Sequence, residues 1–348
     1  MTRLLTDADR NRAWRQARIQ TFESAEPSAA PVLLSIGAQP GAGKTRAVAR
    51  TMNTFYPARS FVPIIGDNLR RYHPDYPALV SSPDPDLMPA ATAELAGWLV
   101  RRSLEHAARH RYCAIVEGTL RSPETTLGTI RQFAAAGATT HLVILGVPEV
   151  DSWTGCIDRY LSALESGNPA RWTPLAAHDA GYRGTPRTLA AARDCPELHR
   201  LTVVDRSGGV AHDDVRGADG AWARPAGGPE ALERLRAARD PGAEERVARL
   251  AARAARLEAD PTVLAGLDHA RRLVESGQTD VRALLESLTA HEHEVLVLLT
   301  RGLSTSAIVQ ELSITQATLH VYIRRIRSKL KLKDHSEGVW GSFPEDIW

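Results

Sequence analysis

A glycine-rich loop that ends in a lysine and a threonine, Gly41-Ala42-Gly43-Lys44-Thr45, is the strongest chemical signal in this sequence. It follows an apolar run at 32–36 and precedes a helical pattern, so it is predicted to join a strand to a helix N-terminus. Backbone N–H groups at such a junction bind phosphate, the lysine adds a mobile charge and the threonine hydroxyl ligates Mg²⁺. The pattern predicts a nucleotide-binding loop, with Ala38 where a first glycine is usual.

Lysine is scarce in this chain, which has 4 lysines against 39 arginines. Lys44 is the only lysine before residue 329, and the other three are Lys329, Lys331 and Lys333. A compact ammonium fits among phosphate oxygens where a broad, planar guanidinium fits badly. Biased composition is the alternative explanation, but we expect every lysine to lie where it can meet phosphate.

Carboxylates follow two further predicted strands. Asp67 comes after the run at 61–65, and Glu117 comes after the run at 113–116. Open α/β sheets bind ligands at the carboxyl ends of their strands, so these residues are expected near the loop. A hydroxyl that accepts a phosphoryl group needs a carboxylate to take its proton, which makes both residues candidates. Capping of the helix at 68–72 is the alternative role for Asp67.

Short apolar runs alternate with helical patterns in the first part of the chain, which predicts an α/β fold with a mostly parallel, five-stranded sheet flanked by helices. The runs are continuous rather than alternating, as in strands that helices cover on both faces. The five predicted strands are residues 32–36, 61–65, 113–116, 141–146 and 201–204. No strand is predicted in the Gly- and Asp-rich segment 207–229. We expect domains at 1–230, 231–285 (an all-α connector) and 286–348.

Composition limits the class of protein. The chain has 348 residues, 43 % of them hydrophobic, and a net charge of only +2, so any nucleic-acid surface must arise from local clustering. Three widely separated cysteines argue against a disulfide framework and a zinc site. The first ten residues lack a signal-peptide core, and no apolar run is long enough to span a bilayer. We therefore expect a soluble, cytoplasmic protein without membrane association.

Several motifs together resemble the zeta toxin family over roughly residues 1–230. They are GAQPGAGKT, Asp67 with His73-Pro74, the segment Glu117-Gly118-Thr119-Leu120-Arg121, and Arg159 with Arg171-Trp172-Thr173-Pro174. The resemblance implies a P-loop kinase that uses ATP or GTP with Mg²⁺ to phosphorylate the 3′-hydroxyl of the amino sugar in UDP-N-acetylglucosamine. It also implies inhibition by an antitoxin protein.

The resemblance assigns roles to individual residues. Asp67 is implied as the acceptor base, Lys44 as the phosphate ligand, Thr45 as the Mg²⁺ ligand, and Arg159 and Arg171 as lid arginines on the γ-phosphoryl group. The implied acceptor pocket consists of Glu117, Thr119 and Arg121. By analogy Arg206 stacks on the purine. A further glutamate of the family falls on Arg101 here, which leaves Glu94 as the candidate upstream carboxylate and leaves the acceptor open. His73, His178 and Asp179 also match and are interpreted as structural.

Residues 286–342 contain start signals for four short helices: Thr289 with Glu292, Ser304, Thr315, and Asp334 with Glu337. In the third helix Leu319, Ile323, Ile326 and Leu330 form an apolar stripe, beside a cationic stripe of His320, Arg324, Arg327 and Lys331. The spacing resembles the LuxR-type helix-turn-helix domain, which implies that 315–327 is a DNA recognition helix. The predicted DNA contacts are Thr315, Gln316, His320, Arg324, Arg327 and Lys331. A dimerisation or inhibitory bundle is the alternative.

Three functions remain open from the sequence. The first is a zeta-type small-molecule kinase with a fused DNA-binding module. The second is a transcription regulator whose P-loop domain only senses a nucleotide. The third is a kinase with a different hydroxyl acceptor, such as an antibiotic, which the Asp67 motif does not distinguish from the first.

Overall fold

The computed structural model describes residues 4–82, 87–168, 170–238, 240–278, 287–301 and 303–329. The chain divides into two compact units, Met1–Val274 and Glu275–Trp348. The first unit therefore includes residues 231–274, which the sequence assigns to a separate connector. Within the described residues, no helix combines the length and the apolar character needed to cross a membrane.

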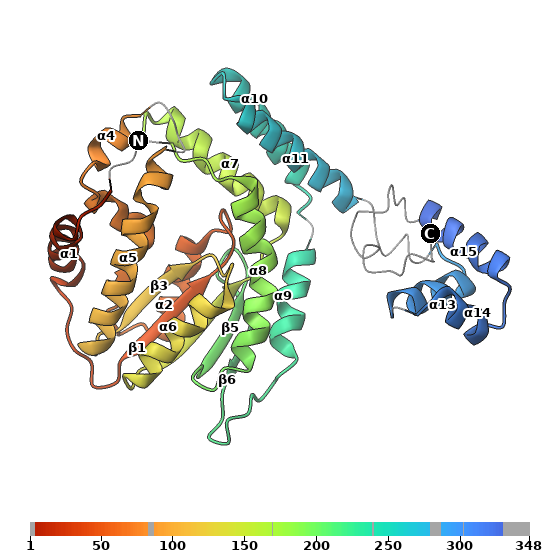
Figure 1. The fold of residues 1–348 in the computed structure, drawn as a ribbon, viewed down its shortest axis with the longest axis horizontal. Helices are drawn as coiled ribbons and strands as arrows, with labels where there is room; N and C mark the ends of the chain where they lie inside the picture. Colours follow the sequence, from red (N-terminus) through yellow and green to blue (C-terminus); the bar gives the residue numbers. More distant parts are fainter. Residues whose placement is uncertain are drawn as a thin grey trace. The chain divides into compact units, whose positions relative to one another are not determined.

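A mostly parallel sheet forms the centre of the first unit (Figure 1). Its strand order is β2-β3-β1-β4-β5-β6, and only β6 is antiparallel to its neighbour. The strands are β1 (Val32–Gly37), β2 (Val62–Ile64), β3 (Ala114–Gly118), β4 (Thr139–Leu145), β5 (Arg200–Val204) and β6 (Val210–Val215). The α/β class, the mostly parallel sheet and the five predicted strands are confirmed.

The sixth strand corrects the prediction of five. β6 lies at the sheet edge, and its buried side chains are the polar residues His212 and Asp214. The flanking Val210 and Val215 are exposed, so an apolar-run criterion finds no signal there. Asp213 of β6 also pairs with Arg200 of β5 at 2.6 Å, which helps to hold the edge strand.

Helices cover both faces of the sheet (Figure 1). Alternate β1 side chains enter different clusters: Leu33 packs with helices α5, α6, α8 and α9, and Leu34 and Ile36 pack with α2. The helices of this unit are α1 (Asp7–Phe22), α2 (Lys44–Phe55), α3 (Gly66–Leu69), the 3₁₀ turn η1 (Arg70–Tyr72), α4 (Tyr76–Val80), α5 (Leu87–Arg109), α6 (Pro123–Ala135), α7 (Glu149–Glu165), α8 (Leu175–Arg193), α9 (Gly227–Ala237), α10 (Ala243–Arg256) and α11 (Pro261–Gln278).

Strand register places the functional loops together. Central strand β1 lies between β3 and β4, with Gly37 aligned to Gly118 of β3 and to Ile144 of β4. The loop after β1 is thus flanked by the turn after β3 on one side and by the entry to α7 on the other. Because these strands are parallel, all three segments leave the same edge of the sheet.

A buried histidine on β4 makes the stability of the first unit depend on pH. His141 is fully buried, and its ring nitrogens lie 3.0 Å from the Tyr56 hydroxyl and 2.7 Å from Thr202 Oγ1. Burial, together with the nearby Arg200 charge, lowers the pKa of His141 from 6.5 to about 3. The unfolded chain therefore binds more protons than the folded one between these two pH values.

We expect the free energy of unfolding to fall as the pH drops below about 6.5, by at most about 1.4 kcal/mol per pH unit for His141. His106, with a pKa lowered to about 4, acts in the same direction. Urea unfolding of the wild type and of His141→Gln at a series of pH values measures this slope. The variant should show a shallower loss; equal slopes in both proteins would contradict the assignment.

Three helices form the described part of the second unit: α13 (Ala290–Thr300), α14 (Thr305–Glu311) and α15 (Gln316–Lys329). The predicted starts are confirmed, because Thr289 and Glu292 form a capping box and Ser304 caps α14. Leu319, Ile323 and Ile326 are buried as predicted. The predicted fourth helix, with Asp334 and Glu337, and the predicted inward residue Leu330 lie outside the described residues.

Candidate active site

The glycine-rich loop has the strand-to-helix geometry that its sequence predicts. Helix α2 begins at Lys44, directly after Gly43, whose φ of 88° lies in the left-handed region that favours glycine. The first turn of α2 therefore presents free N–H groups and the positive end of its dipole. Lys44 Nζ donates to the loop carbonyls of Ala38 at 3.0 Å and Gln39 at 3.2 Å. These bonds hold the ammonium against the loop.

Helix α7 packs directly on this loop. A Cβ atom on Gly41, which has a φ of 74°, would lie 1.9 Å from the Ser152 carbonyl oxygen. A Cβ atom on Gly155 would lie 2.4 Å from the Gly41 carbonyl oxygen. Both positions therefore require glycine, and the contact fixes the loop against α7. Gln39 adds a hydrogen bond of 3.1 Å from Nε2 to Ser152 Oγ.

The pKa of Lys44 responds to two nearby carboxylates. Burial lowers the pKa of Lys44, Glu117 and Asp67 oppose that change through their negative charges, and the Arg159 charge reinforces it. Burial raises the pKa of Glu117, which Lys44 partly offsets and Asp67 increases. The charges of Asp67, Glu117 and Arg159 are therefore close enough to Lys44 to affect it.

Asp67 is held by two arginines. Its Oδ1 accepts hydrogen bonds from Arg171 Nη1 at 2.5 Å and from Arg70 Nε at 3.1 Å. Burial raises the pKa of Asp67, but the charges and hydrogen bonds of Arg171 and Arg70 outweigh it, so the pKa lies below its usual value. Asp67 is ionised at neutral pH, as a proton acceptor must be.

The turn after β3 carries Thr119 and Arg121. Between them Leu120 adopts a φ of 53°, and its side chain is buried against Gly37 at the end of β1. Its carbonyl oxygen accepts a hydrogen bond of 2.9 Å from Thr188 of α8. The strained turn is thus fixed from both sides, with half-buried Thr119 and exposed Arg121 flanking it beside Glu117.

The other predicted arginines lie around the loop. Exposed Arg159 of α7 donates from Nη2 to Thr173 Oγ1 at 2.8 Å. Arg206, after β5, donates to the Asp151 carbonyl oxygen at 2.6 Å. A Cβ atom on Gly43 would lie 3.3 Å from the Arg206 side chain, so this arginine borders the loop.

Glu94 does not join these residues in the structure. It is exposed on α5 and pairs with Arg10 of α1 at 2.6 Å. A role for Glu94 as an upstream substrate carboxylate stays a prediction. His178, by contrast, is fully buried between Ser152 Oγ at 2.9 Å and Asp179 Oδ1 at 3.2 Å, which agrees with a structural role.

The residues present fit a magnesium–nucleotide complex. Thr45 is exposed in the first turn of α2, and its hydroxyl forms no hydrogen bond within the described part of the chain. A hydroxyl oxygen beside a phosphate loop is a suitable Mg²⁺ ligand. Gly41, Ala42, Gly43 and Lys44 would contact the phosphates.

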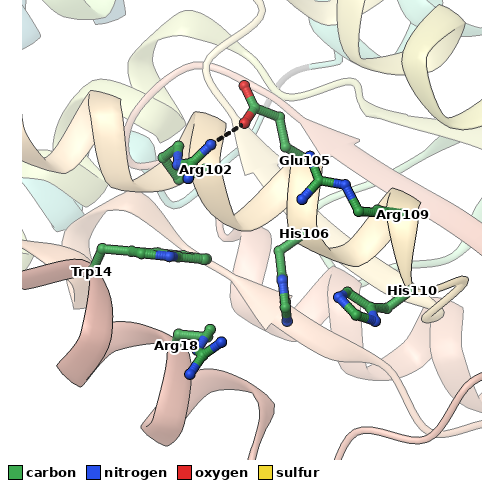
Figure 2. Close-up of a pocket in the computed structure, with 7 residues that line it drawn as sticks. All are labelled: Trp14, Arg18, Arg102, Glu105, His106, Arg109 and His110. Atoms are coloured by element: carbon green, nitrogen blue, oxygen red, sulfur yellow. Dashed lines mark hydrogen bonds and ion pairs between the residues drawn. The ribbon is translucent and has the colours of Figure 1, made fainter. Parts of the chain in front are cut away.

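A separate basic pocket lies away from this site, between α1 and α5 (Figure 2). It has a volume of about 180 Å³. Burial and the neighbouring cations lower the pKa of His106 in this pocket to about 4. Its lining residues are Trp14, Arg18, Arg102, Glu105, His106, Arg109 and His110. None of the predicted site residues lines it.

Helix α15 presents an exposed polar face in the second unit. Gln316, His320 and Arg324 are exposed, and Arg327 is half-buried. Thr315 Oγ1 accepts from Thr318 N–H at 3.1 Å, so this hydroxyl caps the helix. The predicted DNA contact Lys331 lies outside the described residues.

Lys329 corrects the expectation that every lysine meets phosphate. Its Nζ lies 2.5 Å from Oε2 of buried Glu292 and donates to the Ser287 carbonyl oxygen at 2.9 Å. The hydrogen bond from Lys329 is the main cause that lowers the pKa of Glu292. This lysine ties the end of α15 to the start of α13, a tertiary contact that its sequence neighbours do not reveal. Lys333 lies outside the described residues.

Comparisons with known proteins agree with this geometry. The family model described as "Zeta toxin" matches residues 16–215, more than half of the chain. The chain belongs to the zeta toxin family. Residues 286–339 match "Bacterial regulatory proteins, luxR family", which confirms the second resemblance.

Individual relatives in the zeta toxin family match about half of this chain. "Toxin zeta" of Enterococcus hirae is 25% identical over 180 residues, which are 51% of this chain and 62% of that protein. "Toxin PezT" of Streptococcus pneumoniae is 27% identical over 184 residues, 53% of this chain and 72% of that protein. The match thus spans less than two thirds of the E. hirae toxin.

Two further comparisons concern the fold and the C-terminal region. A solved structure from a study of the PezAT chromosomal toxin-antitoxin system of S. pneumoniae matches with a TM-score of 0.58 at 19% identity. It covers 73% of this chain and 97% of that one, which shows a shared fold. "Transcriptional activator protein ExaE" of Pseudomonas putida is 34% identical over 113 residues, 30% of this chain and 53% of that protein.

Sequence reasoning missed several residues that position the site. Arg70 binds Asp67, and the i, i+3 spacing on a helix was a visible signal for that pair. Thr173 binds Arg159, and Gly155 admits the close approach of α7 to the loop. Gly155 and the loop are far apart in the chain, so no local signal in the sequence predicts their contact.

Proposed function

We propose that this protein is a kinase that transfers the γ-phosphoryl group of ATP or GTP to a hydroxyl of a nucleotide sugar, with UDP-N-acetylglucosamine as the favoured acceptor. The observation that carries the proposal is that Lys44, Asp67 and Glu117 lie at or just after the carboxyl ends of the parallel strands β1, β2 and β3. Their charges also affect one another's pKa values. A phosphate-binding lysine beside an ionised carboxylate is the arrangement that phosphoryl transfer to a hydroxyl requires. The amino-sugar 3′-hydroxyl comes from the zeta toxin resemblance.

Each residue has a distinct task in this mechanism. The N–H groups of residues 41–45 and the Lys44 ammonium orient the triphosphate, and Asp67 accepts the proton of the attacking hydroxyl. Glu117, Thr119 and Arg121 bind the acceptor. When bound, Mg²⁺ would neutralise charge on the phosphate oxygens, with Thr45 as its protein ligand.

The lid arginines, Arg159 and Arg171, would offset negative charge on the transferring phosphoryl group. Arg171 pairs with Asp67, and Arg159 is near enough to Lys44 to lower the pKa of its ammonium. Arg159 now donates to the neutral hydroxyl of Thr173. Arg171 shares Oδ1 of Asp67 with Arg70. Phosphate oxygens would offer both guanidinium groups charge-assisted hydrogen bonds. We expect Arg159 and Arg171 to turn toward the transferring phosphoryl group once nucleotide is bound, which would leave Asp67 free to accept the proton.

A substrate screen tests the proposal. The intact chain is incubated with ATP or GTP, Mg²⁺ and a panel of UDP-sugars and hydroxyl-bearing antibiotics. Mass spectrometry then measures the molecular mass of each acceptor. A mass gain of one phosphoryl group on a UDP-sugar supports the proposed acceptor. A gain on an antibiotic alone would change the acceptor and make the protein protective, and no gain on any acceptor would sink the kinase proposal.

We also propose that the second unit binds DNA through α15. The match to the luxR family and the exposed face of Gln316, His320 and Arg324 support it. Arg324→Ala should weaken DNA binding by about fivefold to tenfold at low salt and should reduce the salt slope by about one unit, because one phosphate contact is lost. Fluorescence anisotropy of labelled DNA at several salt concentrations measures both.

Arg131→Ala is the matched control for that prediction, because it removes an exposed arginine from α6 in the first unit. Its salt slope should equal that of the wild type. Equal slopes in all three proteins would exclude α15 as the DNA-contacting helix.

Nucleotide sensing is the second candidate function. The luxR-family match favours nucleotide sensing, because a domain of regulatory proteins is then on the same chain as the phosphate loop. This alternative predicts DNA affinity that changes with ATP and no phosphorylated product in the acceptor screen.

An inhibitory antitoxin protein is the proposed partner of this chain, since the PezT relative is described as a toxin and the related structure comes from a toxin-antitoxin system.

A further inference from the structure

A second hydrophobic core lies behind the lid arginines. Helices α10 and α11 pack against α7 and the turn that follows it. Figure 1 shows α10 and α11 as an extension of the chain beyond the sheet layers. Buried residues from α7 and the turn are Trp153, Cys156, Ile157, Tyr160, Leu161 and Trp172; those from α10 and α11 are Val247, Leu250, Ala254, Val263, Leu267 and Ala270.

Each lid arginine is next in sequence to an aromatic residue of this core. Arg159 precedes Tyr160, which is 7% exposed, and Arg171 precedes Trp172, which is 6% exposed. The two aromatic rings meet edge to face, with centroids 5.3 Å apart. The arginine side chains lie outside this core, where they contact Thr173 and Asp67. The aromatic residues therefore fix the backbone positions from which both arginines reach the site.

Gly266 of α11 makes close contacts in this core. Trp153 donates from Nε1 to the Gly266 carbonyl oxygen at 2.7 Å, and its ring packs edge to face on Trp172. A Cβ atom on Gly266 would lie 2.9 Å from Trp172 and 3.2 Å from Trp153, both part of rigid rings. Only glycine lets α11 approach this closely.

Ion pairs hold the rim of the same interface. Arg246 of α10 pairs with Asp151, and Arg253 pairs with Asp158 and, at 2.7 Å, with Glu165. The three carboxylates are spread along α7, from its first turn to its last. Single exposed pairs stabilise little, but together they set the register of α10 along α7.

We propose that helices α10 and α11 form a brace that positions Arg159 and Arg171 for phosphoryl transfer, with Gly266 and Trp153 as its positioning residues. This inference rests on the proposed kinase function. The brace acts on the arginines through Tyr160 and Trp172, and it does not touch the nucleotide or the acceptor. Residues after the sheet are thus part of the catalytic unit.

Gly266→Ala tests the brace because it adds one methyl group at the contact. We expect kcat to fall about tenfold, with the KM for the acceptor changed by less than about twofold, since none of the proposed acceptor-binding residues lies on α7, α10 or α11. Gly128→Ala on α6 is the matched control, because its added Cβ meets nothing within 4 Å. Both substitutions favour a helix equally, so only the first should lose activity.

A double-mutant cycle separates positioning from general damage. If the brace acts through the lid, Gly266→Ala should have little further effect on kcat in an Arg159→Ala, Arg171→Ala background. A full tenfold loss in that background would overturn the proposal. Trp153→Phe replaces the indole by a smaller phenyl ring and removes the hydrogen bond to the Gly266 carbonyl oxygen, so it should give a loss of kcat of the same kind.

Hydrogen exchange provides a readout that does not depend on activity. Gly266→Ala should speed amide exchange in α7 and in the turn at 171–174 and leave α6 unchanged, whereas Gly128→Ala should leave α7 unchanged. Unchanged exchange in α7 and the turn would refute the brace even if the chain were no kinase. A wild type without transfer activity would refute the proposed function alone.

Discussion

Asp67→Asn is expected to reduce kcat by about a hundredfold to ten-thousandfold, the range in which a general base contributes. The amide cannot accept the acceptor's proton, and it loses the ionic contacts with Arg70 and Arg171. Nucleotide affinity should change little, because the phosphate loop and Lys44 are intact. Initial rates at saturating ATP, together with calorimetric titration of ATP, measure the two effects separately.

Asp75→Asn is the control for this result. Asp75 precedes α4 in the same segment as Asp67, and its side chain makes no capping hydrogen bond. Its turnover should match that of the wild type. If Asp67→Asn retained wild-type turnover, Asp67 would not be the base, and its role would reduce to holding Arg70 and Arg171.

Lys44→Met is expected to lower kcat by about a hundredfold to a thousandfold, the loss measured when one preorganised charge-stabilising donor is removed from an active site. Methionine has a similar length and no charge. Lys44→Arg should be nearly as impaired, because the ammonium fits between the carbonyls of Ala38 and Gln39, a space that a planar guanidinium fills badly. Single-turnover rates with labelled ATP measure this loss.

Arg46→Ala provides the matched control for the loss of charge. Arg46 is exposed in the same turn of α2, so its removal changes the local charge equally without touching the loop carbonyls. It should retain most of the activity. Equal losses in Lys44→Met and Arg46→Ala would point to a general electrostatic effect in place of a specific phosphate contact.

Local patterns predicted the parts of the site that local chemistry determines. The loop 41–45 and Asp67 follow apolar strands, Glu117 lies near the end of one, and parallel strands bring their carboxyl ends to one edge. Thr289 and Glu292 likewise form the predicted capping box within one turn of helix. In these cases the signal and the structure lie within a few residues of each other.

Tertiary contacts account for what the sequence did not predict. Strand β6 buries polar residues and is stabilised by its pairing with β5, so it lacks an apolar run. Glu94 forms an ion pair with Arg10, and Lys329 forms one with Glu292; both partners are distant in sequence. Helices α10 and α11 have an amphipathic pattern that indicates a buried face but not what covers it. Only the folded chain shows that this face packs on α7.

The measurement that tests the central claim most directly is single-turnover transfer from γ-labelled ATP to UDP-N-acetylglucosamine by the intact chain with Mg²⁺. The label should appear on the 3′-hydroxyl of the amino sugar with the wild type, and transfer should drop by at least about a hundredfold with Asp67→Asn. Label that appears only in inorganic phosphate, or equal transfer by the two proteins, would contradict a kinase site built from Lys44, Asp67 and Glu117.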